Sequence, residues 1–402
     1  MLKLIFAMIT FALFSSSCNA ESDQKIWSDS KENIAYNQVK ALEETNSEIT
    51  NSRQNAITKT IQKASPAIVG INVTEIKQVV YRNPFFEDPF FRRFFGDEYG
   101  SRVKEYKVQG LGSGFIISPD GYILTNHHVA GNASKVVITM TDGKRYDAEI
   151  IGSDMVSDVA LLKIEGNNFP YLNLGNSDDI LIGEWAIAFG NPFGLFDLNA
   201  KPTVTVGVVS NVGVNFLHPD EPQNRVYRSM IQTDAAISSG NSGGPLLNAL
   251  GEVIGMNTII YSTANSRQGA GSIGIGFSIP INRVKKIVNM LKSKEEMDRN
   301  FWTGLDVRNI DEQIANYLGI EERDGVVVFG YQSKSPADEA GIKLGDIITA
   351  VDGFPVNKVD DFQIFVGDSF VGDKKQLTIL RDEKEIKVTI VLEKFEGRKR
   401  GR

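Results

Sequence analysis

Short apolar segments separated by turn residues fill the chain between about residue 67 and residue 280. Pro119 and Gly121 mark one turn, and Asp142-Gly143 marks a hairpin, because these residues favour tight backbone reversals. Many short strands without helical patterns between them predict a mainly β fold, a sandwich or a barrel, and disfavour a parallel α/β sheet. The predicted strands are 67–73, 115–117, 122–124, 136–140, 160–164, 185–189, 203–210, 252–257 and 274–279.

Two helices are predicted at the edges of this region. One covers residues 56–64 and ends at Pro66. The second begins after an Asn282 cap, carries Val284, Ile287, Val288 and Leu291 at helical spacing, and ends at Lys292–Lys294. A domain boundary is therefore expected near residue 296. Beyond it, short strands at 325–329, 347–351 and 376–380 predict a smaller second domain that ends near residue 395, followed by a basic tail at 396–402.

The first twenty residues have the pattern of an export signal, with Lys3 ahead of an apolar run from Leu4 to Phe14. Two processing routes are open: cleavage after Ala20, or lipidation of Cys18, which would give a membrane contact. Residues 21–55 are polar and are expected to form an arm or tether. Cys18 is the single cysteine, so no disulfide can form within one chain.

The formal net charge of −7 gives no overall basic field that would attract nucleic acid. Metal catalysis is not expected either, because His127 and His128 are adjacent and lack the helical spacing of a zinc protease motif. Gly269–Gly274 matches a dinucleotide-binding pattern, but a strand follows it instead of a helix, so a loop beside the substrate pocket is expected there. We therefore predict no cofactor.

The segment Gly240–Leu246 places Ser242 in a tight, glycine-rich turn. Such a turn can present a serine nucleophile and can aim backbone N–H groups at a developing oxyanion. A reactive serine needs a histidine base and an orienting acid. The chain has three histidines, His127, His128 and His218, and all precede Ser242. The α/β-hydrolase order, in which the histidine comes last, is thereby excluded, while the order His, acid, Ser stays open.

The pair His127-His128 follows one predicted strand, and Asp154 and Asp158 precede another. Taken separately, the histidine pair is explained as a polar strand end and the aspartate as an ordinary turn acid. Together with the serine turn, in the right order and in a β pattern, they favour a catalytic serine site.

Several motifs resemble those of the HtrA/Deg serine proteases over about residues 56–395. The resemblance implies a chymotrypsin-like double β-barrel protease domain at 56–295 and an α+β PDZ domain at 296–395. It implies that His128 is the base, Asp158 the orienting acid and Ser242 the nucleophile, and that the Gly240–Ser242 turn, with Asn241 at its centre, forms the oxyanion hole. The motifs are Gly112–Phe115, Thr125–Val129, Ser157–Ala160, Gly190–Gly194, Thr233–Ile237 and Gly240–Gly244.

Ala236 stands six residues before Ser242, where trypsin-like relatives that cleave after basic residues carry an acid. With Ile237 beside it, the primary specificity pocket is expected to be apolar and to favour small or medium aliphatic residues. The segment 211–228 resembles the family's regulatory loop, but it lacks the arginine that relatives often carry near the start of this loop. Arg225 and Arg228 are the two candidates to take the place of that arginine. Ser238-Ser239 also replaces the usual Asn-Pro before Gly240.

Phe301–Asp306 resembles the carboxylate-binding loop of a PDZ domain, and Ser335–Asp346 is the strongest PDZ-like run. Such a site binds an extended C-terminal peptide as an added strand. Trp302, Thr303, Gly304 and Leu305 are the expected peptide-binding residues. A small β domain that only packs on the first domain is the alternative.

The resemblance implies an ATP-independent endopeptidase of the cell envelope, in the periplasm of a Gram-negative bacterium, that degrades unfolded or damaged proteins as a homotrimer or larger oligomer. No nucleotide-binding loop is present to power unfolding. A holdase-type chaperone and a regulatory protease with one specific partner are the alternatives. A phenylalanine-rich segment fits either local burial or contacts within and between trimers; its members are Phe85, Phe86, Phe90, Phe91, Phe94 and Phe95.

Overall fold

The computed structural model describes residues 52–82, 101–191, 201–217, 225–238, 240–260, 274–293, 297–318 and 324–395. Side chains are described over the same ranges except at 77–82, 101–108 and 259–260. The export signal with Cys18, most of the polar arm, the phenylalanine-rich segment, most of Gly269–Gly274 and the basic tail lie outside the described residues. All elements discussed below belong to the unit Ala56–Arg402.

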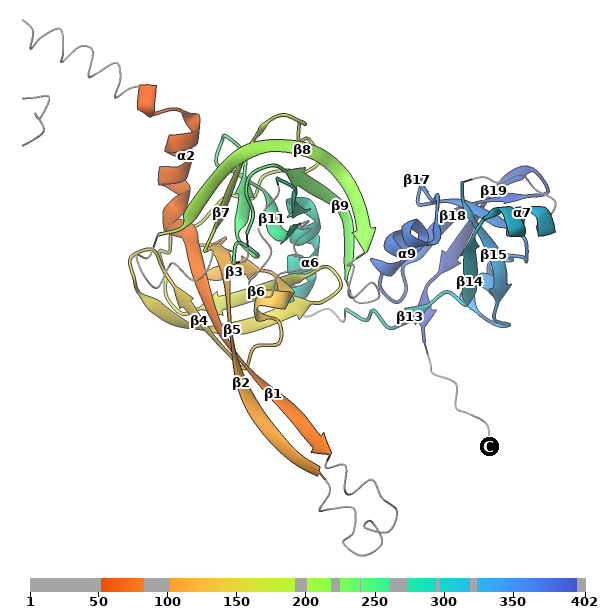
Figure 1. Ribbon diagram of the computed structural model, residues 1–402, viewed down its shortest axis with the longest axis horizontal. Coiled ribbons are helices and arrows are strands. Elements are labelled where there is room, and N and C mark those ends of the chain that lie inside the picture. The colour runs from red at the N-terminus through yellow and green to blue at the C-terminus, as the bar shows by residue number, and fades with distance from the viewer. Residues whose placement is uncertain are drawn as a thin grey trace, which may run out of the picture. The chain divides into compact units, whose positions relative to one another are not determined.

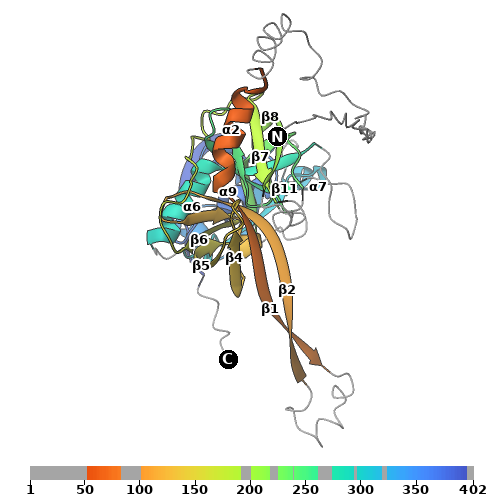
Figure 2. The same ribbon diagram turned by 90° about the vertical axis from the view of Figure 1, so that its left-hand side faces the viewer.

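The first barrel is a closed antiparallel sheet (Figure 1). The predicted turn before β3 forms, with Gly121 at a φ of 97°, where a residue without a Cβ is favoured. Strands β1 and β2 stay paired and extend away from the barrel (Figure 2). In spatial order the strands are β1 (Ile68–Arg82), β2 (Ser101–Ile116), β3 (Tyr122–Thr125), β6 (Val159–Ile164), β5 (Arg145–Asp154) and β4 (Lys135–Thr139).

The second barrel is also closed and antiparallel, which confirms the expected mainly β, double-barrel architecture. Two of its strands, β9 and β10, had not been predicted. Polar residues interrupt the apolar pattern of β9, and β10 is only three residues long. In spatial order the strands are β10 (Pro245–Leu247), β11 (Val253–Ile260), β12 (Gly276–Pro280), β9 (Val226–Thr233), β8 (Thr203–Leu217) and β7 (Trp185–Gly190).

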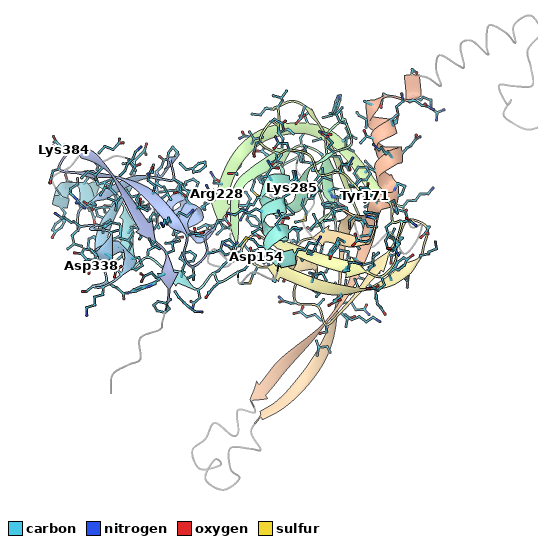
Figure 3. The ribbon with its side chains drawn as sticks, turned by 180° about the vertical axis from the view of Figure 1, so that it is seen from behind. Asp154, Tyr171, Arg228, Lys285, Asp338 and Lys384 are labelled. Carbon is cyan, nitrogen blue, oxygen red and sulfur yellow. The ribbon has the colours of Figure 1, made fainter. Side chains whose placement is uncertain are left out.

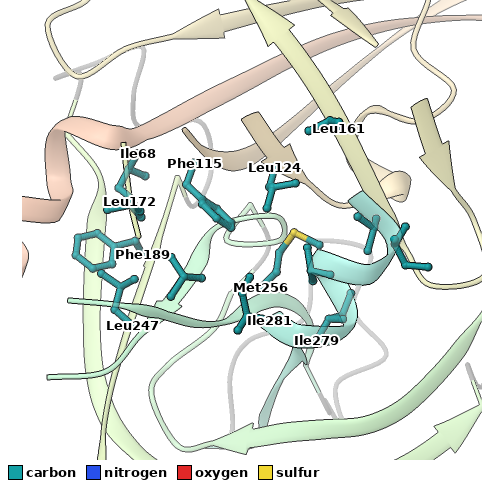
Figure 4. Close-up of a cluster of buried hydrophobic side chains, with 14 of the residues drawn as sticks. Ile68, Phe115, Leu124, Leu161, Leu172, Phe189, Leu247, Met256, Ile279 and Ile281 are labelled. Carbon is teal, nitrogen blue, oxygen red and sulfur yellow. The ribbon is translucent and has the colours of Figure 1, made fainter. Parts of the chain in front are cut away.

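One apolar cluster joins the two barrels (Figure 4). The first barrel contributes Phe115, Leu124 and Leu161, and the second contributes Phe189 and Met256 among others. All five side chains are excluded from solvent. Burying apolar surface stabilises a fold by roughly 25 cal/mol per Å². The same cluster therefore stabilises the protein and fixes how one barrel sits on the other.

Two helices pack on this cluster as predicted. Ile57 and Ile61 of α2 (Ala56–Ala64) contact it, and so do Val284 and Ile287 of α6 (Ile281–Ser293). The prediction that Asn282 caps the second helix was wrong, because the helix begins directly after β12 and includes this residue.

The Asn282 side chain instead donates to Asn176 Oδ1 at 2.6 Å, and its backbone N–H donates to Ser177 Oγ at 3.1 Å. These hydrogen bonds join the start of α6 to the segment before β7.

The C-terminal domain is the expected smaller α+β unit (Figure 1). The five successive strands of its sheet are β14 (Leu305–Asn309), β15 (Val326–Tyr331), β16 (Ile347–Val351), β18 (Lys374–Arg381) and β19 (Lys384–Val391), and β17 (Phe354–Pro355) pairs with β16. A second, two-stranded sheet joins β13 (Phe301–Trp302) to β20 (Glu393–Lys394). The helices are α7 (Glu312–Leu318), α8 (Pro336–Glu339) and α9 (Val359–Gly367). Among the described residues, no helix has the length and apolar character needed to cross a bilayer.

Truncating a side chain in the shared cluster should destabilise both barrels at once. We expect Phe189→Ala to lower the free energy of unfolding by about 3–5 kcal/mol, because a large buried aromatic leaves a cavity. Denaturant titration followed by tryptophan fluorescence measures this change. Leu250→Ala, at a side chain that is 78% exposed, is the control and should change stability by less than about 0.5 kcal/mol. Equal effects of the two substitutions would contradict a joining role for the cluster.

Candidate active site

The predicted catalytic residues come from both barrels. His128 lies in the short helix α4 (His127–Ala130), which follows β3, and Asp158 lies in the turn between β5 and β6. Ser242 lies in the turn that leads into β10 of the second barrel. The site therefore sits at the junction that the shared apolar cluster holds together.

Asp158 holds the His128 imidazole through a two-pronged contact. Nδ1 of His128 lies 2.8 Å from Oδ2 and 3.0 Å from Oδ1 of Asp158, and the backbone N–H of His128 donates to Oδ1 at 3.0 Å. Asp158 is fully buried and has a φ of 58°, which is uncommon for a residue with a Cβ. Its carbonyl accepts from Asn126 Nδ2 at 3.0 Å. This backbone geometry turns the carboxylate toward the imidazole.

Hydrogen-bond donors keep the buried Asp158 ionised. Burial acts to raise the pKa of Asp158, but the nearby imidazole, its hydrogen bonds and the hydroxyl of Thr258 together lower the pKa below its ordinary value. Thr258 Oγ1 donates to Asp158 Oδ2 at 2.8 Å. The sequence had given no signal for Thr258, because it lies on a strand far along the chain from Asp158.

His127 and Asp154, the neighbours of the predicted base and acid, face other partners. Nδ1 of His127 lies 3.1 Å from Ser153 Oγ, and burial lowers the pKa of this imidazole. Asp154 forms a two-pronged ion pair with Arg299, at 2.8 Å from Nε to Oδ1 and 2.7 Å from Nη2 to Oδ2. His128 and Asp158 thus contact each other, whereas His127 and Asp154 have other partners.

Asp154 also fixes the turn that carries Asp158. Its Oδ2 accepts from the backbone N–H of Ser157 at 3.0 Å and from the Ser157 hydroxyl. Burial acts to raise the pKa of Asp154, but the Arg299 charge and these hydrogen bonds outweigh burial and lower it. The Arg299 guanidinium thus binds the carboxylate that fixes the turn carrying the predicted triad acid.

The Ser242 turn is held against the first barrel by its backbone. Ser113 N–H donates to the Ser242 carbonyl at 3.0 Å, and Gly243 N–H donates to Asn257 O at 2.8 Å. Gly243 has a φ of 84°, and a Cβ there would collide with Thr125 and Ser113. The Ser242 hydroxyl donates to Thr258 O at 3.0 Å. A change of the Ser242 χ1 rotamer would redirect this hydroxyl. Ser242 and His128 line the same cavity.

In the turn that is expected to form the oxyanion hole, one backbone N–H group is already hydrogen-bonded and two are available. Asn241 N–H donates to Ser238 O at 2.9 Å, so its backbone donor is already used. Among the described residues, the N–H groups of Gly240 and Ser242 donate to no protein acceptor. Gly240 has a φ of 94°, and its carbonyl accepts from the Ser113 hydroxyl at 2.5 Å. Ser239 lies outside the described residues.

The two residues expected at the primary specificity pocket differ in exposure. Ala236 is exposed, and its carbonyl accepts from Thr205 Oγ1 at 2.7 Å. Ile237 is buried in the core cluster of the second barrel and packs closely on Gly276. Neither position carries a charge, in keeping with an apolar pocket.

The two arginines considered as substitutes in the regulatory segment have different surroundings. Arg225 Nε lies 4.0 Å from Asp158 Oδ1, so a cation stands beside the predicted triad acid. The Arg228 guanidinium, labelled in Figure 3, lies 4.6 Å from the ring centre of Phe354 and 5.3 Å from that of Phe365. Arg228 therefore joins β9 to the C-terminal domain.

A groove of about 850 Å³ lies at the predicted peptide-binding loop. Trp302, Thr303, Gly304 and Leu305 line it, and β14 stands at the edge of the sheet among the described residues. Its opposite wall includes Phe362 and Val366 of α9, and its lining also includes Val156 and Val226 of the barrels.

Removing the Thr258 hydroxyl should change how stability depends on pH. Because the pKa of Asp158 is lowered in the fold, its stabilising effect is present above the ordinary value of about 3.9 and is lost as pH falls through the lowered pKa. Thr258→Val removes one donor and raises that pKa. We expect the free energy of unfolding of this variant at neutral pH to be about 1.5–3 kcal/mol lower than that of wild type. Its acid unfolding should begin at a higher pH than that of wild type.

Thermal unfolding of wild type, Thr258→Val and the conservative control Thr258→Ser between pH 2 and 7 measures this effect. The serine variant should behave like wild type because it keeps a donor. An unchanged acid transition in the valine variant would show that the hydrogen bond does not hold the carboxylate ionised.

Comparisons with known proteins match both domains. The family described as "Trypsin-like peptidase domain" matches residues 112–256, and "PDZ domain" matches residues 304–392. The chain is 40% identical over 346 residues to "Probable periplasmic serine endoprotease DegP-like" of Chlamydia pneumoniae, covering 83% of this chain and 68% of that protein. It is also 40% identical over 340 residues to "Putative serine protease HhoA" of Synechocystis sp., covering 82% of each.

Solved structures agree with these matches. "HtrA-type protease AlgW with decapeptide" superposes with a TM-score of 0.60 at 35% identity, covering 83% of this chain and 97% of that one. "Crystal structure of the serine endoprotease from Yersinia pestis" superposes with a TM-score of 0.53 at 27% identity, covering 84% and 98%. With its double barrel, its PDZ domain and these relatives, the chain belongs to the HtrA/Deg family of serine endoproteases.

Proposed function

We propose that Ser242, His128 and Asp158 carry out peptide-bond hydrolysis as a catalytic triad. The observation that supports this most is the buried Asp158 carboxylate, which holds His128 Nδ1 at 2.8 Å at the cavity that Ser242 also lines. This contact fixes the tautomer in which Nε2 is free to accept the serine proton. Ser242 Oγ then attacks the scissile carbonyl, and the protonated imidazole donates its proton to the leaving amine.

The N–H groups of Gly240 and Ser242 stabilise the tetrahedral oxyanion in this proposal. Both are without a protein acceptor among the described residues, which leaves them available. A preorganised donor of this kind is typically worth about 10²–10³-fold in turnover. Water then enters on the side that the amine has left, and the same imidazole activates it to release the acyl group from Ser242.

Replacing the nucleophile should abolish proteolysis. We expect Ser242→Ala to reduce turnover of a reduced and alkylated protein by about 10⁴–10⁶-fold, because the triad acts as a unit. Product formation is followed by mass spectrometry, which also identifies the residue before each cut. Ser134→Ala, the same chemical change at an exposed serine, is the control and should retain wild-type turnover. Comparable activity of Ser242→Ala and wild type would refute the assignment.

The substrates in this proposal are unfolded or damaged proteins of the periplasm. The Chlamydia pneumoniae relative is named a probable periplasmic serine endoprotease, and residues 1–20 have the pattern of an export signal. The uncharged positions Ala236 and Ile237 support cleavage after small or medium aliphatic residues such as Val, Ile or Ala. We also propose that the protein forms a homotrimer or a larger oligomer. The proposed domain boundaries lie at residues 55, 295 and 395.

The C-terminal domain is proposed to bind C-terminal peptides and to regulate the protease. Its groove carries the predicted carboxylate loop, and the AlgW structure described above contains a decapeptide. The free edge of β14 and the face of α9 on either side of the groove support an added peptide strand.

The contacts between this domain and the turn that carries Asp158 support a regulatory role. Arg299 pairs with Asp154, which fixes the turn before Asp158. From the other side, Arg283 pairs with Asp368 at the end of α9, at 2.9 Å. Both arginine side chains are largely buried, so solvent screens these ion pairs less than surface pairs.

The same chain of contacts continues through the backbone. Arg283 also donates to Val226 O at 2.8 Å, and Val226 N–H donates to Val156 O at 2.9 Å, inside the turn that carries Asp158. A peptide that moves α9 would therefore act on this turn.

Breaking the Arg299 contact should uncouple peptide binding from activity. Allosteric coupling is typically worth about 5–150-fold. We expect a C-terminal peptide to change kcat/KM of wild type by about fivefold or more, and to change that of Arg299→Ala by less than about twofold. Lys384→Ala is the control, because this exposed cation lies in the C-terminal domain on β19, at the opposite edge of the sheet from β14. Wild-type coupling in Arg299→Ala would contradict the proposed route.

A regulatory protease with one specific partner is the second candidate, and the buried ion pairs around Asp154 favour it. Strong peptide activation together with weak cleavage of unfolded proteins would support it over general degradation. The holdase alternative rests on the phenylalanine-rich segment, which lies outside the described residues; aggregation suppression by Ser242→Ala measures that activity separately.

A further inference from the structure

Tyr227, on β9, is a buried tyrosine whose hydroxyl lies near the predicted triad acid. Only 2% of this residue is exposed. Its ring packs against Phe216 of β8, with 5.1 Å between the ring centres, in the apolar cluster that joins the two barrels. A phenylalanine would fill this apolar space equally well. A buried hydroxyl is stable only with hydrogen-bond partners, so the partners of the Tyr227 hydroxyl indicate its role.

The Tyr227 hydroxyl is hydrogen-bonded to the side chains of Thr258 and Arg225. The number of protons on each group gives the direction of these bonds. The Thr258 hydroxyl donates its single proton to Asp158 Oδ2 at 2.8 Å, so its oxygen accepts from Tyr227. The Arg225 guanidinium has donors and no acceptor, so it donates to the Tyr227 oxygen. The hydrogen bonds therefore run in one direction, from Arg225 through Tyr227 and Thr258 to Asp158.

The Tyr227 hydroxyl keeps the proton that this chain of hydrogen bonds needs. Burial raises the pKa of Tyr227 well above its ordinary value, and the Asp158 charge raises it further. The Arg225 charge and the two hydrogen bonds act in the opposite direction and are outweighed. Tyr227 is therefore neutral at working pH and donates to Thr258.

The start of β9 brings Arg225 and Tyr227 to the same side of the chain. Side chains two residues apart in an extended segment lie on one face. The backbone N–H of Val226, between them, donates to Val156 O at 2.9 Å, which holds this segment against the turn that carries Asp158. The Val226 side chain packs in the core of the C-terminal domain. The side chains on either side of it reach the triad acid instead, and Arg225 Nε lies 4.0 Å from Asp158 Oδ1.

We propose that Tyr227 is a positioning residue of the active site, whose hydroxyl holds the Thr258 proton on Asp158. A threonine hydroxyl proton can rotate to several positions, and it has fewer choices when the oxygen already accepts a directed hydrogen bond. Arg225 is the charged group at the outer end of the chain, and each hydrogen bond in such a chain polarises the next. The role rests on the triad proposed above, because Tyr227 acts only through the acid that orients His128.

Reaction of Ser242 with a fluorophosphonate measures the triad without peptide recognition. Ser242 Oγ bonds to phosphorus as the P–F bond breaks, fluoride leaves, and His128 takes the hydroxyl proton. Mass spectrometry of the intact protein follows the rate of labelling. Wild type should be labelled once, and Ser242→Ala should not be labelled.

Tyr227→Phe removes the hydroxyl and keeps the ring. We expect labelling about two- to tenfold slower than in wild type, the range that one hydrogen bond covers. Cleavage of a peptide anilide with valine before the scissile bond should show the same decrease in kcat, with KM changed by less than about twofold. Tyr146→Phe, the same change at a partly buried tyrosine of β5 that packs edge-on against Phe169, is the control and should keep the wild-type values.

The double variant Tyr227→Phe/Thr258→Val tests whether the two residues act in one chain. If Tyr227 acts through Thr258, the double variant is labelled as slowly as Thr258→Val and no more slowly. Two independent effects would multiply. Each variant is labelled below its own unfolding temperature, so that loss of the fold does not enter the rate.

Labelling of Tyr227→Phe at the wild-type rate would overturn the proposal, and so would decreases that multiply in the double variant. A rise in KM with unchanged kcat would also count against it, because that pattern indicates weaker substrate binding. Failure to label wild type, or equal labelling of Ser242→Ala, would refute the triad and the positioning role together. Labelling that depends on Ser242 but not on Tyr227 would refute the positioning role alone.

Discussion

The apolar layer between the two barrels is the constraint on which the active site depends. His128 and Asp158 belong to one barrel and Ser242 to the other, so no local structure can bring all three together. Phe115 and Phe189 meet in the shared cluster, where each is fully buried. Close packing makes such a layer rigid, since even small shifts create voids or clashes. The relative position of the proposed base and nucleophile is therefore a property of the core.

Hydrogen bonds across the same junction set the finer geometry. Ser113 of the first barrel donates through its backbone to Ser242 and through its hydroxyl to Gly240. Thr258 of the second barrel donates its hydroxyl to Asp158, and its carbonyl accepts from Ser242. Each barrel thus supplies a residue that orients a proposed catalytic group of the other. Small relative movements of the barrels would disturb the serine turn and the carboxylate together.

The turn from Asp154 to Asp158 is where the second domain and the predicted triad meet. Asp154 binds Arg299 outside the barrel, and Asp158 binds His128 inside it. Both carboxylates are buried with lowered pKa values, because each has a cationic partner or donors that outweigh the cost of burial. Breaking a buried ion pair leaves an uncompensated charge, so this turn is sensitive to events at the Arg299 side. That sensitivity is what the proposed regulation by a bound peptide requires.

Sequence patterns predicted most of the local structure for a simple reason. Alternating apolar residues and turn residues such as Pro119, Gly121 and Gly143 act within a few positions, so most strands of both barrels could be predicted from them. Strands β5, β9 and β10 were missed. The prediction failed where tertiary packing overrides local preference. Asn282 does not cap α6, because the preceding strand runs directly into the helix and its side chain finds Asn176 instead.

The sequence by itself determined the chemistry that this protein can carry. The scarcity and order of its histidines, together with the serine turn and the acids before β6, limited a serine site to the order histidine, acid, serine, because a serine nucleophile needs a base and an orienting acid. The choice of His128 and Asp158 within the two neighbouring pairs came from the family resemblance. Only the tertiary structure decided the partners that act across long stretches of chain. Thr258 contacts Asp158 from one hundred positions away, and Arg299 reaches Asp154 across 145. Such contacts arise from how packed barrels and domains meet in space, and no local pattern encodes them.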